Sequence, residues 1–407
     1  MPKGIFDGVR IVDTGQWLAG TGAGAILGYL GAETIKIEDP VRGDSYRGMA
    51  SQYGERTSVK GRHIGFETAN LNKKSMTLDL KKEKGKQVLF ELVKKCDIFH
   101  TNATDSVRKK LGLDYQILKA HNPKVIYGVT TIYGSRGRLN DRRGFDTIAQ
   151  AYSGIMWSTG DQDYDEPMGI TGALIDWSAA CTMAFAMSSA LLARDRLGIG
   201  QEIHVSLLGS SLYLQTFNTN MTLLRGRPWA RYKRRTSANP LSNNYRCSDG
   251  KWIMLAEPQS QRFWAEACDL FGISPLAADP RFATSEARTK NCAELVKILD
   301  GVFAKKSRDE WIDLLEKSGT RMAYSAVFDL SETLNQQQTI DNGYVEDFNH
   351  PVMGPVKLSG FPVWFSETPG RIHSEAPEHG QHTEEVLIDI LGYSWEQVGE
   401  LRAEGVI

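Results

Sequence analysis

Residues Gly8–Glu38 read GVRIVDTGQWLAGTGAGAILGYLGAETIKIE and set the architecture of the chain. The β-branched run Val9–Val12 predicts a strand, and the small and apolar residues of Gly22–Leu30 predict a helix. Glu33–Ile37 then predicts a second strand. A strand, a helix and a strand in this order indicate two parallel strands whose connecting helix covers one face of a sheet.

The same alternation continues along the first half of the chain. Glu83–Lys95 has helical periodicity, Ile98–His100 predicts a strand, Asp105–Leu111 begins a helix, and Val125–Val129 predicts another strand. We therefore expect an α/β fold with a Rossmann-like parallel sheet in a large domain.

The pattern of predicted strands and helices changes after residue 225, and we expect a different kind of domain there. Tyr245–Leu255 predicts two strands joined at Asp249-Gly250, a strong hairpin signal. Three helical segments follow at Gln261–Phe271, Ala293–Lys305 and Arg308–Ser318. These patterns predict a small central α+β domain over residues 225–330, after a large domain over 1–224.

The C-terminal segment, residues 331–407, is too short to bury a core of its own, so we expect it to return to the large domain. Gly354–Val363 predicts a strand, and Thr383–Leu391 and Trp395–Ala403 predict short helices.

Composition excludes several classes of protein. The 407 residues carry 48 basic and 49 acidic side chains, so the balance is not that of a nucleic-acid or anionic-membrane binder. Five scattered cysteines without a CxxC pair indicate neither disulfides nor a zinc site, and favour a cytoplasmic location. His379 and His382 are interpreted as surface histidines, and no metal is expected.

One carboxylate, Asp176, precedes the uncharged run Trp177–Ala193, which predicts a buried core helix after a strand-like segment. Exposed N–H groups and the dipole at a helix N-terminus would favour its ionised form and would also suit an oxyanion. Asp176 is thus either a nucleophile or an ordinary first-turn acid, and the commoner explanation is structural.

Other motifs have simpler explanations. Gly20, Gly22 and Gly24 lie too far from the first strand for a dinucleotide-binding fingerprint, and predict close helix–sheet packing instead. The acidic run 161–165 and the basic run 231–235 are interpreted as solvated loops. The lysine-rich residues 81–86 and Arg108–Lys110 follow strand ends, where phosphate groups bind in parallel sheets.

Several segments together resemble the family III CoA-transferases. The resemblance covers nearly the whole chain and is carried by residues 8–13, 30–38, 72–80, 144–154, 172–180, 200–206 and 249–250. It implies a large α/β domain built from both chain ends, a small central domain, and an interlocked homodimer or heterodimer. The substrates would be an acyl-CoA and a carboxylic acid, with coenzyme A carried between acids and no metal required.

The resemblance also assigns roles to individual residues. The nucleophile falls on Asp176, and Arg143, Phe145 and Asp146 would lie near the reacting centre. Contacts to coenzyme A would fall on Leu18, Ala19, Leu78, Asp79, Leu80, Lys81, Asn102, Ala103, Thr104 and Lys110.

Departures from the family pattern bear on the substrate. α-Methylacyl-CoA racemases share the fold but need a histidine where this chain has Phe145, which favours a transferase. Glycines expected between Thr236 and Lys251 for oxalate transfer are missing. Trp17, Trp157 and Trp177 favour a bulky acceptor, an aromatic or branched acid such as an aryl-lactate or benzylsuccinate, with succinyl-CoA as one candidate donor. A racemase or a non-catalytic CoA-binding partner subunit remain the alternatives.

Overall fold

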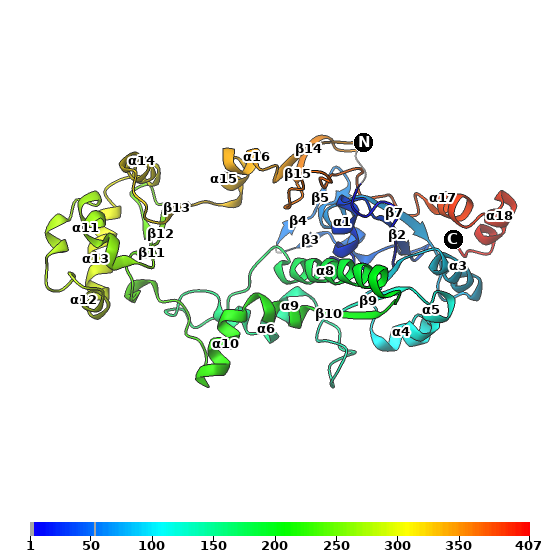
Figure 1. The fold of residues 1–407 in the computed structure, drawn as a ribbon. Coiled ribbons are helices and arrows are strands. Elements are labelled where there is room, and N and C mark those ends of the chain that lie inside the picture. Colours follow the sequence, from blue (N-terminus) through cyan, green and yellow to red (C-terminus); the bar gives the residue numbers. More distant parts are fainter. Residues whose placement is uncertain (1–3, 53) are drawn as a thin grey trace. The chain divides into compact units, whose positions relative to one another are not determined.

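The computed structural model describes residues 4–52 and 54–407, which form two compact units. Unit 1 contains the described residues up to Trp157, together with Met168–Pro228 and Gly343–Ile407. Unit 2 contains Ser158–Pro167 and Trp229–Asn342. Figure 1 labels many of the helices and strands of both units.

Unit 1 is built on a six-stranded parallel sheet in the order β10-β9-β8-β1-β2-β7. The strands are β1 (Arg10–Asp13), β2 (Glu33–Glu38), β7 (Lys73–Thr77), β8 (Ile98–Thr101), β9 (Ile126–Thr131) and β10 (Glu202–Ser206). The expected α/β fold with a Rossmann-like parallel sheet is confirmed. The chain builds outward from β1 in one direction and then from β8 in the other. Ligands of doubly wound sheets bind at such a reversal, outside the carboxyl ends of the strands.

Each face of the sheet buries its own apolar core, because successive strand residues point to opposite sides. Ile11 belongs to the core under α1 (Gly22–Tyr29) and α8 (Leu174–Leu197). Its neighbour Val12 belongs to the core under α3 (Glu83–Lys94), α5 (Tyr115–His121) and α18 (Trp395–Ala403). The C-terminal helix α18 therefore completes one layer of the sheet formed by the first half of the chain.

Shorter elements complete unit 1. They are η1 (Ser45–Gly48), β3 (Ser51–Gln52), β4 (Glu55–Arg56), β5 (Ser58–Val59), β6 (Arg62–His63), α2 (Ile64–Asn70), α4 (Asp105–Leu111), α6 (Asp146–Tyr152), α7 (Ile155–Ser158), α9 (Leu207–Leu214), α10 (Thr216–Arg225), β14 (Val345–His350), β15 (Gly354–Ser359) and α17 (Thr383–Glu385), which continues as a π-helical turn over Val386–Ile390. The strand predicted over Gly354–Val363 ends early, at Ser359, and Pro362 beyond it has no N–H to donate to a ladder.

Unit 2 packs helices against a three-stranded antiparallel sheet. Its strands are β11 (Ser242–Arg246), β12 (Trp252–Ala256) and β13 (Tyr324–Val327), and its helices are η2 (Arg234–Thr236), α11 (Ser260–Leu270), η3 (Ser274–Ala277), α12 (Ser285–Lys290), α13 (Cys292–Phe303), α14 (Arg308–Ser318), α15 (Leu330–Leu334) and α16 (Gln337–Asp341). The predicted hairpin is confirmed, and Gly250 supplies its turn with a φ of +81°. Tyr245, Trp264 and Phe303 lie in the core.

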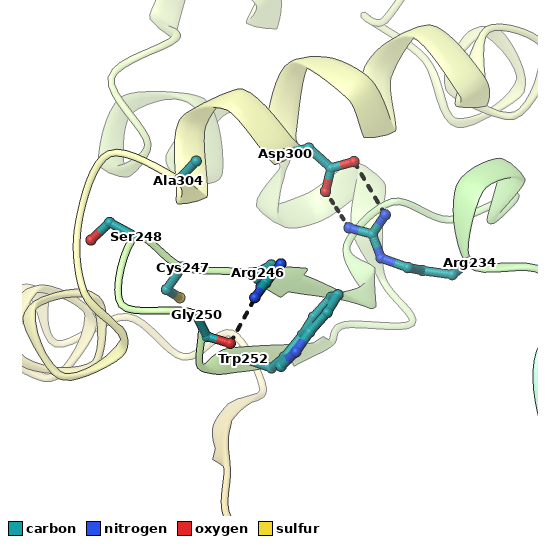
Figure 2. Close-up of a pocket in the computed structure, with 8 residues that line it drawn as sticks. All are labelled: Arg234, Arg246, Cys247, Ser248, Gly250, Trp252, Asp300 and Ala304. Atoms are coloured by element: carbon teal, nitrogen blue, oxygen red, sulfur yellow. Dashed lines mark hydrogen bonds and ion pairs between the residues drawn. The ribbon is translucent and has the colours of Figure 1, made fainter.

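The charged loops of unit 2 are largely exposed to solvent, as predicted, although Arg234 is partly buried. Arg234 pairs with Asp300 of α13, beside a cavity of about 630 Å³ (Figure 2). Lys233 and Arg235 each lie within 4.0 Å of Asp163 in the acidic loop. The basic and acidic runs thus lie side by side, although they are far apart in the sequence.

Helix α8 differs from its prediction in two respects. No strand precedes it, and Asp176 is the third residue of the helix itself. The helix is also not fully buried, because Phe185 is 73% and Leu192 52% exposed. Within the described residues α8 alone has the length and hydropathy of a membrane span, which is weak support for one. Its packing against α1 and the sheet accounts for its apolar buried face.

The three glycines after β1 allow close packing, as predicted. A Cβ on Gly22 would lie 2.9 Å from the Cβ of Ala180 in α8, and one on Gly24 would lie 2.9 Å from Thr34. Gly20 is tighter still, because a Cβ there would lie 2.2 Å from the side chain of Asn102.

We predict that Gly20→Ala lowers the free energy of unfolding of the protein by about 2 to 3 kcal/mol, since neighbouring backbone would have to move. The matched control is Gly48→Ala, where an added Cβ meets nothing within 4 Å, and it should change stability by less than about 0.5 kcal/mol. Urea unfolding of both variants measures the difference. Equal stability of the two would show that the loop after β1 adapts freely.

Candidate functional site

Two ion pairs without solvent exposure lie beneath the carboxyl end of the sheet. Lys73 of β7 bonds Asp13 of β1 at 2.9 Å, and Lys36 of β2 bonds Asp44 at 2.7 Å. Burial alone would raise the pKa of Asp13, but Lys73 and a hydrogen bond from His100 hold it well below its usual range. Burial opposes the charge of Lys36, yet Asp44 and Asp13 keep its pKa raised. These shifts favour the charged forms of Asp13 and Lys36, whereas burial lowers the pKa of Lys73 to about 8.

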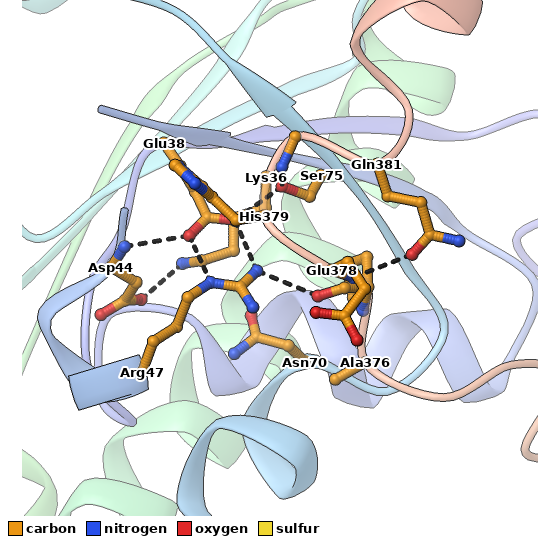
Figure 3. A network of polar contacts seen from close by, with 12 residues as sticks. Lys36, Glu38, Asp44, Arg47, Asn70, Ser75, Ala376, Glu378, His379 and Gln381 are labelled. Atoms are coloured by element: carbon orange, nitrogen blue, oxygen red, sulfur yellow. Dashed lines mark hydrogen bonds and ion pairs between the residues drawn. The ribbon is translucent and has the colours of Figure 1, made fainter. Parts of the chain in front are cut away.

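Glu38, at the end of β2, joins this network to the C-terminal segment (Figure 3). Its carboxylate accepts two hydrogen bonds from Arg47, each 2.8 Å long, one from Ser75 at 2.6 Å and one from the Asp44 N–H. Arg47 also donates to the carbonyl of Pro377. Burial raises the pKa of Glu38, but Arg47 outweighs it and the pKa falls to about 2. Its hydrogen-bonding positions are thus occupied by groups within the chain.

The network fixes the backbone of the loop after β1. Lys36 donates to the carbonyl of Gly15 at 2.7 Å. Asn102, just after β8, bonds both the N–H and the carbonyl of Gln16. Asp44 accepts the N–H of Trp17 at 3.2 Å. Trp17 has a φ of +61°, which a bulky side chain rarely adopts, so the surrounding hydrogen bonds hold it there.

The held ring of Trp17 bridges two parts of the site. It lies 5.4 Å from the ring of Tyr46 and meets the ring of Phe145 edge-on at 5.3 Å. Phe145 immediately precedes α6, whose first residue is Asp146. Trp17 thus connects the loop after β1 with the acid at the start of α6.

Asp146 and Asp176 form the second part of the site. One oxygen of Asp146 accepts the N–H groups of Ile175 at 2.7 Å and Asp176 at 3.1 Å, while the other bonds the Gln150 amide. Asp146 therefore caps α8 from another helix, a task that the residue before the helix, Ala173 with a φ of +54°, does not perform.

This arrangement opposes ionisation of Asp176. Burial, and then the charge of Asp146, raise the pKa of Asp176 to about 7. The sequence-based prediction that the helix N-terminus would favour the charged form is wrong, because Asp146 takes the N–H groups and adds a like charge. For the same reason the N–H groups of Ile175 and Asp176 are not free to bind an oxyanion.

A cavity of about 350 Å³ lies beside the start of α8. Its apolar lining includes Leu18, Tyr46, Ile64, Ala173 and Trp177, and its polar lining includes Gln52, Arg56, Thr57 and Thr68. Trp17 and Trp177 pack against the same apolar cluster as Leu18 and Tyr46. Trp157 is 53% exposed and lines no part of this cavity.

The expected CoA contacts fall in two places. Leu18 and Ala19 follow β1, and Asn102, Ala103 and Thr104 follow β8, so these residues meet where the strand order reverses.

The remaining expected CoA contacts lie near the edge strand β7 or on the surface. Leu78, Asp79, Leu80 and Lys81 follow β7; Leu78 and Leu80 pack into the core, and Lys81 pairs with Asp39. Lys110 is exposed near the end of α4, and Arg143 is exposed before α6. Because β1 and β2 separate β7 from β8, the two basic segments do not share one strand junction.

The charged network was missed in reading the sequence, although a signal existed. Lys36 interrupts the run Thr-Ile-Lys-Ile, and Lys73 opens a strand whose next residues are also polar. A lysine inside an otherwise apolar strand needs a buried partner. The pattern therefore predicts acids nearby, which prove to be Asp13 and Asp44.

No cluster of three or more His, Cys, Asp or Glu suited to a metal occurs in the described part of the chain. His379 contacts the carbonyl of Asp39 at 2.9 Å, and His382 accepts the N–H of Ser75 at 3.2 Å. His382 is thus part of the packing of the C-terminal segment and not a simple surface histidine.

The doubly wound α/β fold, the acid pair and the cavity are together typical of enzymes that bind a ligand near the point where the strand order reverses. The model of CoA-transferase family III matches residues 6–383, and the chain belongs to this family. It is therefore an enzyme that transfers coenzyme A between carboxylic acids, with acyl-CoA and carboxylate substrates. The family is one of soluble enzymes.

Three relatives illustrate the match. The chain is 31% identical to a succinyl-CoA:glutarate CoA-transferase of Mus musculus, over 99% of this chain and 90% of that protein. It is 28% identical to a cinnamoyl-CoA:phenyllactate CoA-transferase of Clostridium sporogenes, over 98% and 96%. The crystal structure of a CAIB/BAIF family protein from Brucella suis superposes with a TM-score of 0.83 at 28% identity, over 96% of this chain and 100% of that one.

We predict that Asp176→Asn stabilises the protein in a pH-dependent way. The folded state holds the Asp176 proton up to a pKa of about 7, whereas the unfolded chain releases it near pH 4. The charge thus costs stability progressively as pH rises between these values, and the cost is fully present above them. Asparagine should add about 2 to 4 kcal/mol to the free energy of unfolding at pH 8 and nearly nothing at pH 4.

Urea unfolding at several pH values measures this gain. Asp195→Asn is the matched control, because Asp195 is exposed near the other end of the same helix, and its effect should stay below about 0.5 kcal/mol. A gain for Asp176→Asn that does not change with pH would contradict the raised pKa.

Proposed function

We propose that Asp176 is the covalent nucleophile of this CoA-transferase, working with Asp146 as its positioning acid. The observation that supports this most strongly is the coupling of the two carboxylates at the first turn of α8, beside an apolar cavity. A raised pKa near a ligand-sized cavity is typical of functional carboxylates.

The first half of the reaction moves coenzyme A onto the enzyme. The Asp176 carboxylate attacks the thioester carbonyl carbon of the donor, the carbon–sulfur bond breaks, and the CoA thiolate leaves from an aspartyl–acyl anhydride. The thiolate then attacks the aspartyl carbonyl of that anhydride. The donor acid departs as a carboxylate, and an aspartyl-CoA thioester remains on Asp176.

The second half runs the same steps in reverse order with the acceptor. The acceptor carboxylate attacks the aspartyl thioester and releases the CoA thiolate from a second anhydride. The thiolate attacks the acceptor carbonyl, which frees Asp176 as a carboxylate and forms the product thioester. Every bond broken is matched by one of similar energy, so no ATP is needed. Water must be excluded because anhydrides hydrolyse readily.

Asp146 would serve this sequence in two ways. Its bonds to the N–H groups of Ile175 and Asp176 fix the first turn of α8, so that the nucleophile keeps one position. Its charge also raises the pKa of Asp176, which makes the ionised carboxylate a stronger base and nucleophile than an ordinary aspartate.

Coenzyme A would enter over the strand reversal. Leu18, Ala19, Asn102, Ala103 and Thr104 would contact the end of the cofactor nearer to Asp176. Residues Leu78–Lys81 and Lys110 would lie toward its nucleotide end, where lysines suit phosphate. Arg143 and Phe145 would border the reacting centre, and the ring contact of Phe145 with Trp17 supports this placement.

The relatives suggest the acids. The glutarate enzyme supports succinyl-CoA as the donor, and the phenyllactate enzyme, with Trp17 and Trp177 beside the cavity, supports an aromatic or branched acceptor. A racemase receives no support, because the ring of Phe145 cannot exchange a proton.

We also propose that two chains form an interlocked dimer and that the protein is cytoplasmic. Within each chain, the proposed domain division remains 1–224, 225–330 and 331–407. Exposed apolar side chains on α8, α9 and α10 support association: Phe185, Leu192, Tyr213, Phe217, Leu223 and Leu224. The five scattered cysteines without a CxxC pair favour a reducing compartment.

We predict that Asp176→Ala lowers the rate of CoA transfer by roughly 1000-fold or more, as loss of a nucleophile does. In the unaltered enzyme treated with acyl-CoA, hydroxylamine should convert Asp176 to a hydroxamate that peptide mass spectrometry locates. Asp195→Ala is the control and should transfer at the normal rate and be trapped equally well. Normal turnover by Asp176→Ala would refute the mechanism.

We also predict that kcat/KM rises with pH through an apparent pKa of about 7, because only the ionised Asp176 attacks. Asp146→Asn removes the like charge while keeping an oxygen acceptor for the two N–H groups. Its profile should therefore shift to lower pH, even if its maximum rate falls. A profile that is flat from about pH 5 to 8, or that shifts upward in this variant, would contradict the role of the acid pair.

A further inference from the structure

The cavity beside α8 contains a cation that the proposed mechanism does not use. Arg56, in β4, lines this cavity of about 350 Å³, whose other walls include Tyr46 and Trp177. No carboxylate of the described residues lies within ion-pair distance of Arg56. Two arginines nearby in sequence differ: Arg47 pairs with Glu38, and Arg62 pairs with Glu67 and Glu378.

We propose that this cavity holds the free end of a dicarboxylic acid, and that Arg56 binds its second carboxylate. The inference rests on the proposed function and narrows it: the substrates are dicarboxylic acids and their CoA thioesters. An aryl-substituted dicarboxylic acid such as benzylsuccinate satisfies both this inference and the aromatic walls of the cavity.

The position of the cavity relative to the nucleophile is the first argument. Ala173 and Trp177 both line it, and they bracket Asp176 at the start of α8. Tyr46, on another wall, contacts Trp17, which in turn contacts Phe145 next to Asp146. An acid whose reacting carboxylate meets Asp176 would therefore extend its remaining atoms along these rings.

The chemistry of the lining is the second argument. Leu18, Ile64 and Trp177 suit a hydrocarbon segment, whereas Arg56 presents a planar guanidinium that binds a carboxylate with two parallel hydrogen bonds. Gln52 adds an amide that can donate a further hydrogen bond, whereas the hydroxyls of Thr57 and Thr68 already donate to the carbonyls of Met49 and Ile64. Arg56 is exposed, so a monocarboxylic acid of the same length would leave it hydrated and would lack the charge-assisted hydrogen bonds that a second carboxylate gains.

The volume is the third argument. Ligand cavities commonly measure about 300–1,000 Å³, and this one lies at the lower end of that range. It suits a short acid better than a long acyl chain.

The test measures binding apart from catalysis. Glutarate and pentanoate have chains of equal length, and only glutarate has a second carboxylate. Their dissociation constants are measured by tryptophan fluorescence on Asp176→Asn, which cannot react, alone and combined with Arg56→Gln, Arg56→Lys or Arg196→Gln. Arg196 is the matched control, because it is exposed on α8, roughly 30 Å along the helix from Asp176.

The inference predicts that Arg56→Gln weakens glutarate binding roughly 10- to 100-fold, the effect of losing one charge-assisted hydrogen bond or two. Pentanoate binding should not change, Arg56→Lys should restore part of the loss, and Arg196→Gln should change neither acid. In the active enzyme, Arg56→Gln should lower kcat/KM for glutarate relative to pentanoate by the same factor.

Three results would overturn the inference. They are equal binding of the two acids by the parent protein, an unchanged dissociation constant for glutarate in Arg56→Gln, and an equal loss for both acids or for free CoA. A loss of free CoA binding would assign the cavity to the pantetheine arm of CoA. If glutarate binding depends on Arg56 while Asp176 is never trapped, the covalent mechanism fails and this inference stands; the reverse pattern refutes this inference alone.

Discussion

The carboxylate of Asp146 is the constraint on which the site depends. By accepting the N–H groups of Ile175 and Asp176, it ties the start of α6 to the start of α8 and replaces the missing cap of the longer helix. The same oxygen atoms carry the charge that, together with burial, raises the pKa of Asp176 to about 7. One side chain thus sets both the position and the basicity of the proposed nucleophile.

Two buried ion pairs stabilise the loop that contacts the Asp146 and Asp176 region. Buried ion pairs stabilise a fold only when their remaining hydrogen-bonding positions are satisfied. Here Lys36 bonds both Asp44 and the carbonyl of Gly15, and Lys73 bonds both Asp13 and Thr21. The network's effect reaches the surface through Trp17, which Asp44 holds in a left-handed conformation between Tyr46 and Phe145. The buried network thereby fixes Trp17, which packs against the cavity residues Leu18 and Tyr46.

Periodicity predicted the interior of this fold better than its edges. The strands at the centre, β1, β2, β8 and β9, are apolar runs and were found from the sequence. The two edge strands, Lys73–Thr77 and Glu202–Ser206, alternate with polar residues and gave no such signal. The local sequence singled out Asp176 but left it either a nucleophile or an ordinary first-turn acid, and the resemblance to the family assigned it the nucleophile's role. Its ionisation was predicted wrongly, since that depends on Asp146, which lies 30 positions earlier.

Contacts distant in sequence account for the other differences. The partners of Lys36, Lys73 and Arg234 follow only from the folded chain, as does the exposure of Phe185 and Leu192 on α8. That Arg56 has no carboxylate partner among the described residues could not be predicted either, because it depends on which acids the neighbouring arginines bind.

The most direct measurement of the central claim follows the oxygen atoms of Asp176. When the acceptor carboxylate carries a heavy oxygen isotope, each pass through the two anhydrides leaves one labelled oxygen on the nucleophile. After turnover, mass spectrometry of the peptide containing Asp176 should therefore show the label in that residue. Efficient transfer with no label in Asp176, or with the label in another carboxylate, would contradict the account.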